Sequence, residues 1–306
     1  MEILNALTVD VEDYYHVSAF ERHITRERWH DFDSRVEAST RRLLDILAEA
    51  DTRATFFVLG WVARRHPELV REIHDAGHEL GSHSFWHRLV FELSPEEFRN
   101  DLRDSRAVLE DAAGQPITAY RAPSFSITRR SQWALEILAE EGFNVDSSIF
   151  PIRHDRYGIP DANPHLHEIS TPAGPLQEFP PSVVRFARMN FPVSGGGYFR
   201  LYPLSWTVRG LSRVNGKGRP FMFYIHPWEL DPDQPRLAAG SRLSRARHRV
   251  NLASTAEKLR RLLGRFRFGR MDESIEATLR ANNGGSGGGE RCLRKATKRC
   301  ESATIE

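Results

Sequence analysis

Cysteine is almost absent from this sequence: its 306 residues include two, Cys292 and Cys300, both close to the end. A disulfide framework or a cysteine zinc site therefore does not hold the fold together. The sequence also lacks a cationic start, and its first apolar stretch meets an acid at Asp10. We expect neither a secretory signal nor a membrane span, and hence a cytoplasmic protein.

An excess of charge of one sign is also lacking. Lys and Arg number 43 against 41 Asp and Glu, for a formal net charge of +2. This balance gives no reason to expect a nucleic-acid partner. Apolar residues make up 40% of the chain and aromatic residues 10%, which is enough for a sizeable core and excludes disorder of the whole chain.

Short apolar runs alternate with segments of helical periodicity along the chain. The runs predict strands at 4–10, 54–59, 78–82, 117–121, 143–146 and 220–226. The periodic segments predict helices at 34–50, 67–76, 94–114, 128–142 and 254–264. Helices that separate short apolar strands favour an α/β fold with a parallel sheet, either open or closed as a barrel.

The length of the sequence and the positions of its Pro- and Gly-rich stretches predict one large domain over residues 1–281. Residues 151–206 are rich in Pro and Gly, and we interpret them as an elaborated connection with two short strands at 168–171 and 176–179. A helical segment is expected at about 235–281. Residues 282–306 are predicted to be a Gly/Ser linker followed by a disordered basic tail.

Polar side chains of catalytic potential follow the ends of the predicted strands. They are Asp10, Glu12, Asp13, His83, Arg121, Asp146 and His226. In parallel α/β sheets and barrels the carboxyl ends of the strands carry the active site. The sequence therefore predicts one site at this edge of the sheet.

Two of these groups have the chemistry of a metal site. His83 and His87 are four residues apart, in a helical or looped segment after a strand, and can share a metal through their imidazole nitrogens. Two histidines and one carboxylate make a set of three ligands that leaves positions open for water and substrate. Strand alternation favours Glu12 as the acid, whereas a strand that ends at Val11 would let the loop turn Asp13 inward. Asp13 is the preferred ligand, with Glu12 as the alternative.

With these motifs, the sequence resembles the polysaccharide deacetylases with a NodB homology domain. The motifs occur in the family's order, as Asp10-Val-Glu-Asp13, His83-Ser-Phe-Trp-His87, Arg121-Ala-Pro123, Asp146-Ser-Ser148 and Tyr224-Ile-His226. The stretches 8–14 and 195–203 are similar to the branch linked to exopolysaccharide synthesis in bacteria with exosortase systems. The resemblance covers residues 4–275 and implies an irregular (β/α) barrel of the NodB type.

The resemblance also implies roles for the residues. A divalent ion, with zinc expected, would be held by the acid and the two histidines. Asp10 would be the general base and His226 the general acid, since the pKa of an imidazole lies near neutrality. Arg121 would pair with Asp10 and keep it ionised, and Asp146 would orient His226.

The expected activity is removal of N-acetyl groups from N-acetylhexosamine units of a polysaccharide or oligosaccharide, in exopolysaccharide biosynthesis. Aromatic side chains near the predicted edge could stack on sugar rings; they are Trp86, Phe125, Phe150, Tyr198, Phe199 and Trp228. The arginine-rich residues 236–270 would suit peripheral contact with a membrane that carries a lipid-linked precursor, or would be a solvated helix face. The alternatives are an allantoinase-like hydrolase of small amides and a non-catalytic carbohydrate-binding protein.

Overall fold

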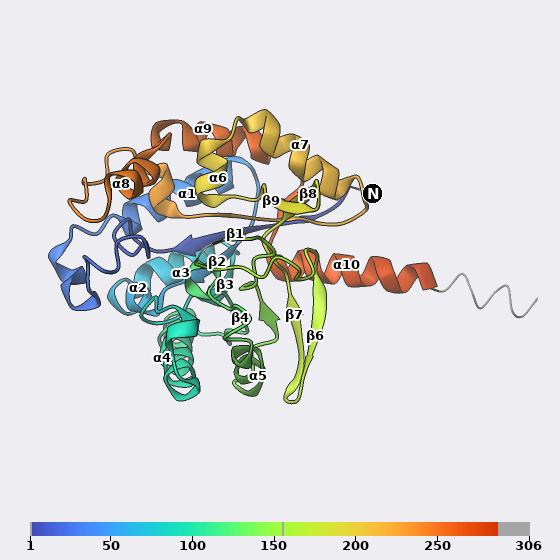
Figure 1. The fold of residues 1–306 in the computed structure, drawn as a ribbon, viewed down its shortest axis with the longest axis horizontal. Coiled ribbons are helices and arrows are strands. Elements are labelled where there is room, and N and C mark those ends of the chain that lie inside the picture. The colour runs from blue at the N-terminus through green and yellow to red at the C-terminus, as the bar shows by residue number, and fades with distance from the viewer. Residues whose placement is uncertain (1, 155, 287–306) are drawn as a thin grey trace, which may run out of the picture.

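The computed structural model describes residues 2–154 and 156–286, in which strands and helices alternate (Figure 1). The strands are β1 (Asn5–Val11), β2 (Thr55–Val58), β3 (Glu79–Ser82), β4 (Ala119–Tyr120), β5 (Val145–Asp146), β6 (His167–Thr171), β7 (Gly174–Glu178), β8 (Val183–Phe186), β9 (Met189–Pro192), β10 (Met222–Ile225) and β11 (Phe268–Gly269). The helices are α1 (Val36–Glu49), α2 (Gly60–Arg65), α3 (Pro67–Asp75), α4 (Pro95–Ala113), α5 (Trp133–Glu140), α6 (Gly196–Leu201), α7 (Leu204–Asn215), α8 (Arg242–Arg249), α9 (Leu252–Leu263) and α10 (Met271–Ser286). Short 3-10 turns lie at Arg26–Asp31, Val90–Glu92, Pro123–Phe125 and Pro227–Leu230.

Most of the strands belong to one sheet. Its order over the described residues is β10-β1-β2-β3-β4-β5-β7-β6, and β11 pairs with the start of β1. β6 and β7 form an antiparallel pair at one edge, whereas the other neighbours in this order run parallel. The sheet curls into a half-barrel, which confirms the predicted α/β class with mostly parallel strands.

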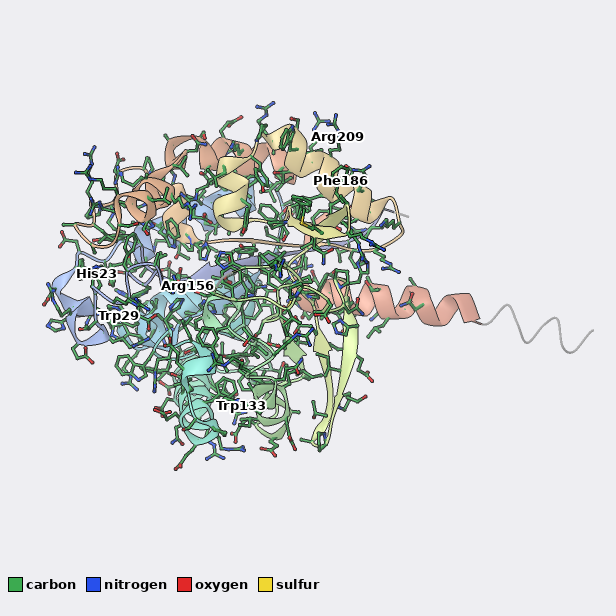
Figure 2. All side chains as sticks on the ribbon, viewed as in Figure 1. His23, Trp29, Trp133, Arg156, Phe186 and Arg209 are labelled. Carbon is green, nitrogen blue, oxygen red and sulfur yellow. The ribbon has the colours of Figure 1, made fainter. Side chains whose placement is uncertain are left out.

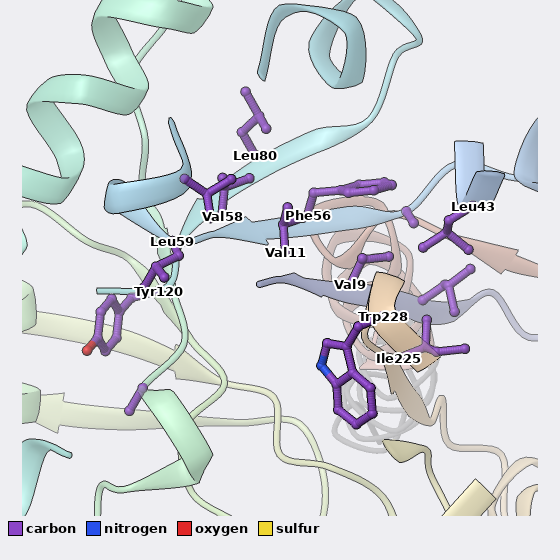
Figure 3. Close-up of a cluster of buried hydrophobic side chains, with 14 of the residues drawn as sticks. Val9, Val11, Leu43, Phe56, Val58, Leu59, Leu80, Tyr120, Ile225 and Trp228 are labelled. Carbon is purple, nitrogen blue, oxygen red and sulfur yellow. The ribbon is translucent and has the colours of Figure 1, made fainter. Parts of the chain in front are cut away.

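β1 lies inside the sheet and is buried along its whole length. A large core packs on one face of the sheet, and from β1 it takes Leu7, Val9 and Val11 (Figure 3). A smaller core on the other face takes Ala6. Since side chains alternate along a strand, Thr8 and Asp10 share the face of Ala6. β1 therefore carries polar side chains onto the inner face of the half-barrel.

The helix boundaries follow the signals in the sequence. Ser94 accepts a hydrogen bond from the backbone N–H of Glu97, whose carboxylate accepts from the backbone N–H of Ser94, so a capping box begins α4. Gly114 ends the same helix in the left-handed conformation, with φ +67°. Pro67 stands in the first turn of α3.

The C-terminal half differs from the prediction in several elements. The connection at 151–206 carries the expected pair β6 and β7, and in addition the hairpin β8–β9 and helix α6. Helix α10 continues to Ser286, into the segment predicted as a linker. The remainder of the predicted tail lies outside the described residues. Within the described part of the chain, no helix combines the length and apolar character needed to cross a membrane.

The glycine run 195–197, at the start of α6, makes a close approach between two segments possible. Gly195 forms a β-bridge to Tyr224 of β10 and has φ +132°, a conformation that favours glycine. A Cβ atom at this position would lie 1.8 Å from the carbonyl oxygen of Tyr224. The run therefore lets the chain pack directly against β10 and begin α6 beside it.

Candidate active site

The end of β1 supplies two carboxylates to the inner face of the sheet. Asp10 lies within the strand, Glu12 follows just beyond its end, and both side chains are buried. The alternation of the strand continues past Val11, so Glu12 projects on the same side as Asp10. Its Oε1 accepts a hydrogen bond from Trp228 Nε1 over 3.3 Å.

The structure corrects the preferred acidic ligand. Asp13 is buried, but its carboxylate turns away from the histidines toward the start of α1, where Oδ2 accepts from Ser34 Oγ over 2.7 Å and from the backbone N–H of Arg35 over 2.9 Å. The backbone N–H of Val36 also donates to it, over 3.2 Å. Asp13 therefore satisfies unpaired N–H groups of a helix N-terminus, and Glu12, the alternative, takes the inward position.

His83 and His87 lie in an irregular loop after β3. Of the helical and looped segments that the sequence allowed, the structure has the loop. The Asp101 carboxylate in α4 holds this loop by accepting from the backbone N–H groups of Phe85 over 2.8 Å and Trp86 over 3.2 Å. His87 itself has φ +51°, which is uncommon for a residue with a side chain. The loop thus folds back so that both imidazoles face the end of β1.

Glu12, His83 and His87 converge. One ligand atom from each lies within 4.8 Å of the others, and all three side chains are buried. His87 Nε2 is 2.7 Å from Glu12 Oε2, an oxygen that accepts no well-aligned hydrogen bond among the described residues. A buried carboxylate oxygen of this kind, between two imidazoles, is suited to a cation.

The protonation of these groups also fits metal ligands. His83 Nδ1 is 2.8 Å from the backbone oxygen of Arg121 and donates to it, so Nε2 keeps its lone pair. Burial lowers the pKa of His83 to about 4, which keeps the imidazole neutral. Burial opposes the charge of Glu12, but His87, with further contributions from His226 and His83, holds the pKa of this carboxyl well below its usual range.

Arg121 pairs with Asp10, as predicted. Its Nη1 donates to Asp10 Oδ1 over 2.7 Å and to Thr8 Oγ1 over 2.8 Å, and the guanidinium is fully buried. Its Nη2 donates to Ser147 Oγ over 2.8 Å. Its Cζ lies over the ring of Phe57, 4.2 Å from the ring centroid. One buried arginine thus fixes the carboxylate of Asp10 and, through its own backbone oxygen, the imidazole of His83.

His226 faces the two carboxylates from the end of β10. Its Nε2 lies 3.8 Å from Asp10 Oδ2 and 3.6 Å from Glu12 Oε1. Its Nδ1 lies 3.0 Å from Glu229 Oε2, which also accepts from the backbone N–H of His226 over 3.0 Å. Burial disfavours the imidazolium, but the hydrogen bond and charge of Glu229, with the charges of Glu12 and Asp10, raise the pKa of His226 to about 9.

The structure therefore corrects the partner of His226, because Glu229 and not Asp146 contacts its Nδ1. Asp146 is buried beside Glu178, and its Oδ1 accepts a hydrogen bond from Ser148 Oγ. Burial, together with the charge of Asp146, raises the pKa of Glu178 well above its usual value, so the pair holds a proton more readily than two separate carboxyls would.

Two site residues escaped the sequence prediction, Glu229 and Arg200. Arg200 in α6 is buried and donates from Nε to Glu229 Oε1 over 2.6 Å. Its guanidinium also lies over the ring of Trp228, at 5.0 Å. Glu229 stands three residues after His226, in a turn that begins at Pro227. This capping spacing is a signal in the sequence that could have predicted the contact. No local signal connects Arg200 to the site.

A cavity of about 200 Å³ opens over the reactive groups. Its walls include Asp10, Glu12, His83, His87, His226, Ser18, Ser124 and the aromatic side chains of Phe125, Tyr157, Tyr224 and Trp228. Of the six aromatic residues predicted near the edge, Trp86, Phe150, Tyr198 and Phe199 are not among its walls. Phe125 and Trp228 are therefore the two that line this cavity.

A larger hollow of about 880 Å³ adjoins the cavity and shares Ser18 and Tyr157 with it. His23 and Arg156, labelled in Figure 2, are among its walls. A small hollow of about 60 Å³ contacts Ser124 on the cavity side and Leu89 on the side of the larger hollow. The reactive groups thus lie at one end of a longer depression.

The chain is similar to proteins that remove acetyl groups from sugars. It is 27% identical over 150 residues to a peptidoglycan-N-acetylglucosamine deacetylase of Bacillus cereus, a match that covers 45% of this chain and 53% of the relative. It is 29% identical over 100 residues to a chitooligosaccharide deacetylase of Rhizobium leguminosarum biovar trifolii, with 33% of this chain and 44% of the relative covered. The chain thus spans about half the length of these curated relatives.

A solved structure shares the fold, and two family models match separate regions of the chain. The crystal structure of a candidate polysaccharide deacetylase from Mycobacterium smegmatis has the same fold, with a TM-score of 0.59 at 22% identity over 92% of this chain and 91% of that chain. Residues 147–276 match a domain of unknown function, DUF3473, and residues 26–143 match the model of the polysaccharide deacetylases. Residues 26–143 therefore match the polysaccharide deacetylase family, and a DUF3473 region follows them in the chain.

Proposed function

We propose that this protein is a metal-dependent deacetylase that hydrolyses the N-acetyl groups of amino sugars within a glycan. The observation that carries the proposal is the convergence of Glu12, His83 and His87 in the same cavity as Asp10 and His226. Three metal-binding side chains, a candidate base and a candidate acid in one cavity are the parts that amide hydrolysis requires. The names of the two curated relatives point to the same reaction on N-acetylated sugars.

Glu12, His83 and His87 would hold the metal, and we propose zinc because two imidazoles and one carboxylate are a common zinc set with open positions. When bound there, the ion supplies Lewis-acid polarisation of the acetamide carbonyl and lowers the pKa of a water molecule. Trp228 orients Glu12, and the backbone oxygen of Arg121 orients His83. Such outer contacts keep the ligands in place.

The side chains of Asp10 and His226 would move the protons. Asp10 takes one proton from the attacking water, whose oxygen forms a new bond to the acetyl carbon. The C–N bond breaks with its electron pair going to nitrogen, and His226 Nε2 gives that nitrogen a proton, so that an amine leaves. Solvent then returns a proton to His226 and takes one from Asp10. The net reaction consumes one water and yields the free amine and acetic acid.

The dimensions of the depression favour a glycan over a small amide. The cavity of about 200 Å³ over the reactive groups has room for an acetamido group and part of a sugar ring, and the adjoining hollow of about 880 Å³ has room for neighbouring sugars. A small cyclic amide would leave the larger hollow empty. Phe125 and Tyr157 provide aromatic surface close to the reactive groups.

Among glycans, we propose an exopolysaccharide or its lipid-linked precursor as the substrate. The support is the resemblance of residues 8–14 and 195–203 to the exopolysaccharide-linked branch, together with the arginine-rich stretch 236–270. A cationic surface of this kind would favour contact with anionic lipid headgroups.

Acetate release from chito-oligosaccharides of one to six sugars, before and after metal removal with a chelator, tests the proposed activity. We expect release that rises with chain length, is lost without metal and returns with zinc. Allantoin in parallel reactions separates the small-amide alternative. Binding of the oligosaccharides by the zinc-loaded protein without acetate release would mean that it is a carbohydrate-binding protein and not an enzyme.

A further inference from the structure

The candidate acid His226 has a fixed set of neighbours behind its ring. Glu229 Oε2 accepts from both the backbone N–H and the ring Nδ1 of His226, each over 3.0 Å. The other carboxylate oxygen, Oε1, accepts from Arg200 Nε over 2.6 Å. Glu229 and Arg200 are buried, with 1% and 4% of their surfaces exposed. Both oxygens of one buried carboxylate are therefore committed, one to His226 and one to a single arginine.

Arg200 is itself held from several sides. Its Nη1 donates to the backbone oxygens of Arg247, His248 and Val250, over 3.1, 2.8 and 3.2 Å. Its own backbone oxygen accepts from Asn251 Nδ2 over 2.8 Å. A guanidinium fixed in this way has little freedom, so it defines where the Glu229 carboxylate lies.

We propose that Glu229 and Arg200 are positioning residues for the proposed deacetylation: Arg200 fixes the Glu229 carboxylate, and Glu229 fixes His226 so that Nε2 is the atom that protonates the leaving amine. This inference rests on the proposed function. It is a role that the resemblance had placed on Asp146, which makes no contact with His226 among those that the structure shows.

The physical argument concerns the direction of the imidazole. A carboxylate at Nδ1 keeps the proton on that nitrogen and leaves Nε2 to exchange its proton with the substrate. With Nδ1 held, Nε2 points toward Asp10 and Glu12, at 3.8 and 3.6 Å. A buried carboxylate without a cation would be costly, and Arg200 provides a cation in direct contact with Glu229.

The position of Arg200 depends on the DUF3473 region. Gly195 and Gly196, with φ of +132° and +53°, bring the start of α6 against Tyr224 of β10. Arg200 lies in the next turn of that helix. The DUF3473 region, which follows the deacetylase match in the chain, thus contains His226, Glu229 and Arg200.

The test compares two substrates, because only one of them needs an acid. The amine that leaves from an N-acetyl sugar must be protonated, whereas the phenolate that leaves from 4-nitrophenyl acetate is stable without a proton. In the zinc-loaded protein, Glu229→Gln should lower kcat on chitotetraose about 10- to 100-fold and change hydrolysis of the aryl ester less than about 3-fold. Arg200→Lys should show the same selectivity with a smaller loss.

The matched control is Asp231→Asn. Asp231 is a buried acid two residues beyond Glu229 that pairs with Arg35 over 2.8 Å and makes no contact with His226 among the described interactions. Loss of the Asp231 charge in this variant should lower thermal stability and leave the ratio of the two activities unchanged. A loss in Glu229→Gln that is equal on both substrates, or no loss on chitotetraose, would overturn the inference. If Glu229→Gln does not fold, Arg200→Lys decides by the same ratio.

A second measurement does not depend on turnover. Held by a buried carboxylate, the Nδ1–H of His226 should exchange slowly with water and give a resolved low-field proton resonance that disappears in His226→Ala. Glu229→Gln should shift this resonance or broaden it beyond detection, and an unchanged signal would contradict the inference. Wild-type protein that gives this signal but releases no acetate would refute the proposed function alone.

Discussion

Glu12 and Asp13 are neighbours in the chain, yet their carboxylates serve two different structures. Glu12 Oε2 lies 2.7 Å from His87 Nε2 inside the cavity, whereas Asp13 Oδ2 accepts from Ser34 Oγ over 2.7 Å at the start of α1. The first acid belongs to the candidate metal site and the second to the helix that packs beside it. Substitution of each should therefore change a different property.

Glu12→Gln should weaken zinc binding by more than about 100-fold, because a direct ligand contributes more than the 10- to 100-fold that outer partners contribute. Asp13→Asn should bind zinc as the wild type does and lower the free energy of unfolding by about 0.5–2 kcal/mol, the range for loss of a helix cap. Zinc competition with a chromogenic chelator and urea unfolding measure the two effects. Loss of zinc in Asp13→Asn with Glu12→Gln unaffected would reverse our assignment.

His226→Ala should lower kcat for deacetylation about 10²- to 10⁴-fold, the usual contribution of a general acid, and leave zinc content unchanged. His83→Ala is the comparison, since loss of this imidazole should remove both zinc and activity. Metal analysis of the two purified variants beside the wild type distinguishes the roles. Absence of zinc from His226→Ala would make His226 a ligand.

Asp101→Asn should loosen the loop that carries His83 and His87, because one of its two hydrogen bonds from the backbone N–H groups of Phe85 and Trp86 is lost. We expect a decrease in zinc affinity of about 10- to 100-fold, as for other groups that orient ligands. Isothermal titration with zinc measures the change. An affinity equal to that of the wild type would show that the loop is held without Asp101.

The carboxyl pair of Asp146 and Glu178 should make stability depend on pH. Burial raises the pKa of Asp146 to about 6 and that of Glu178 well above its usual value, so the folded protein keeps protons that the unfolded chain releases near pH 4. Stability therefore falls as the pH rises from about 5 through these raised pKa values, with a slope of up to about 1.4 kcal/mol per pH unit for each proton. Glu178→Gln should flatten this fall, as measured by urea unfolding between pH 5 and 9. Parallel curves for variant and wild type would contradict it.

Periodicity and capping signals predicted most of the strands and helices that carry the site. They worked because the apolar alternation of β1 and the capping box of α4 are determined by a few neighbouring residues. The identity of the acidic ligand was harder, since the strand could continue or turn at Val11. The hydrogen bonds that Ser34 and the backbone N–H of Arg35 donate to Asp13 decided the question, and these partners are more than 20 residues away in the sequence.

Contacts between distant segments explain the other differences. The Arg200–Glu229 pair joins residues 29 positions apart, and it forms because Gly195 and Gly196, at the start of α6, approach β10 closely. The sequence marked those glycines as an irregular connection but gave no indication of the strand that they would meet. The order of the motifs predicted that Asp146 orients His226. In the structure the side chain of Asp146 interacts with another buried acid, Glu178.

The two matched regions meet between residues 143 and 147, yet the sheet continues across this junction. β10 pairs with β1 along one side, and β7 pairs with β5 across the junction itself. Cutting the chain at that junction would leave one edge of β1 unpaired and would separate Glu12, His83 and His87 from His226. A transplant that keeps the candidate site intact would consequently need the whole sheet and not either matched region by itself.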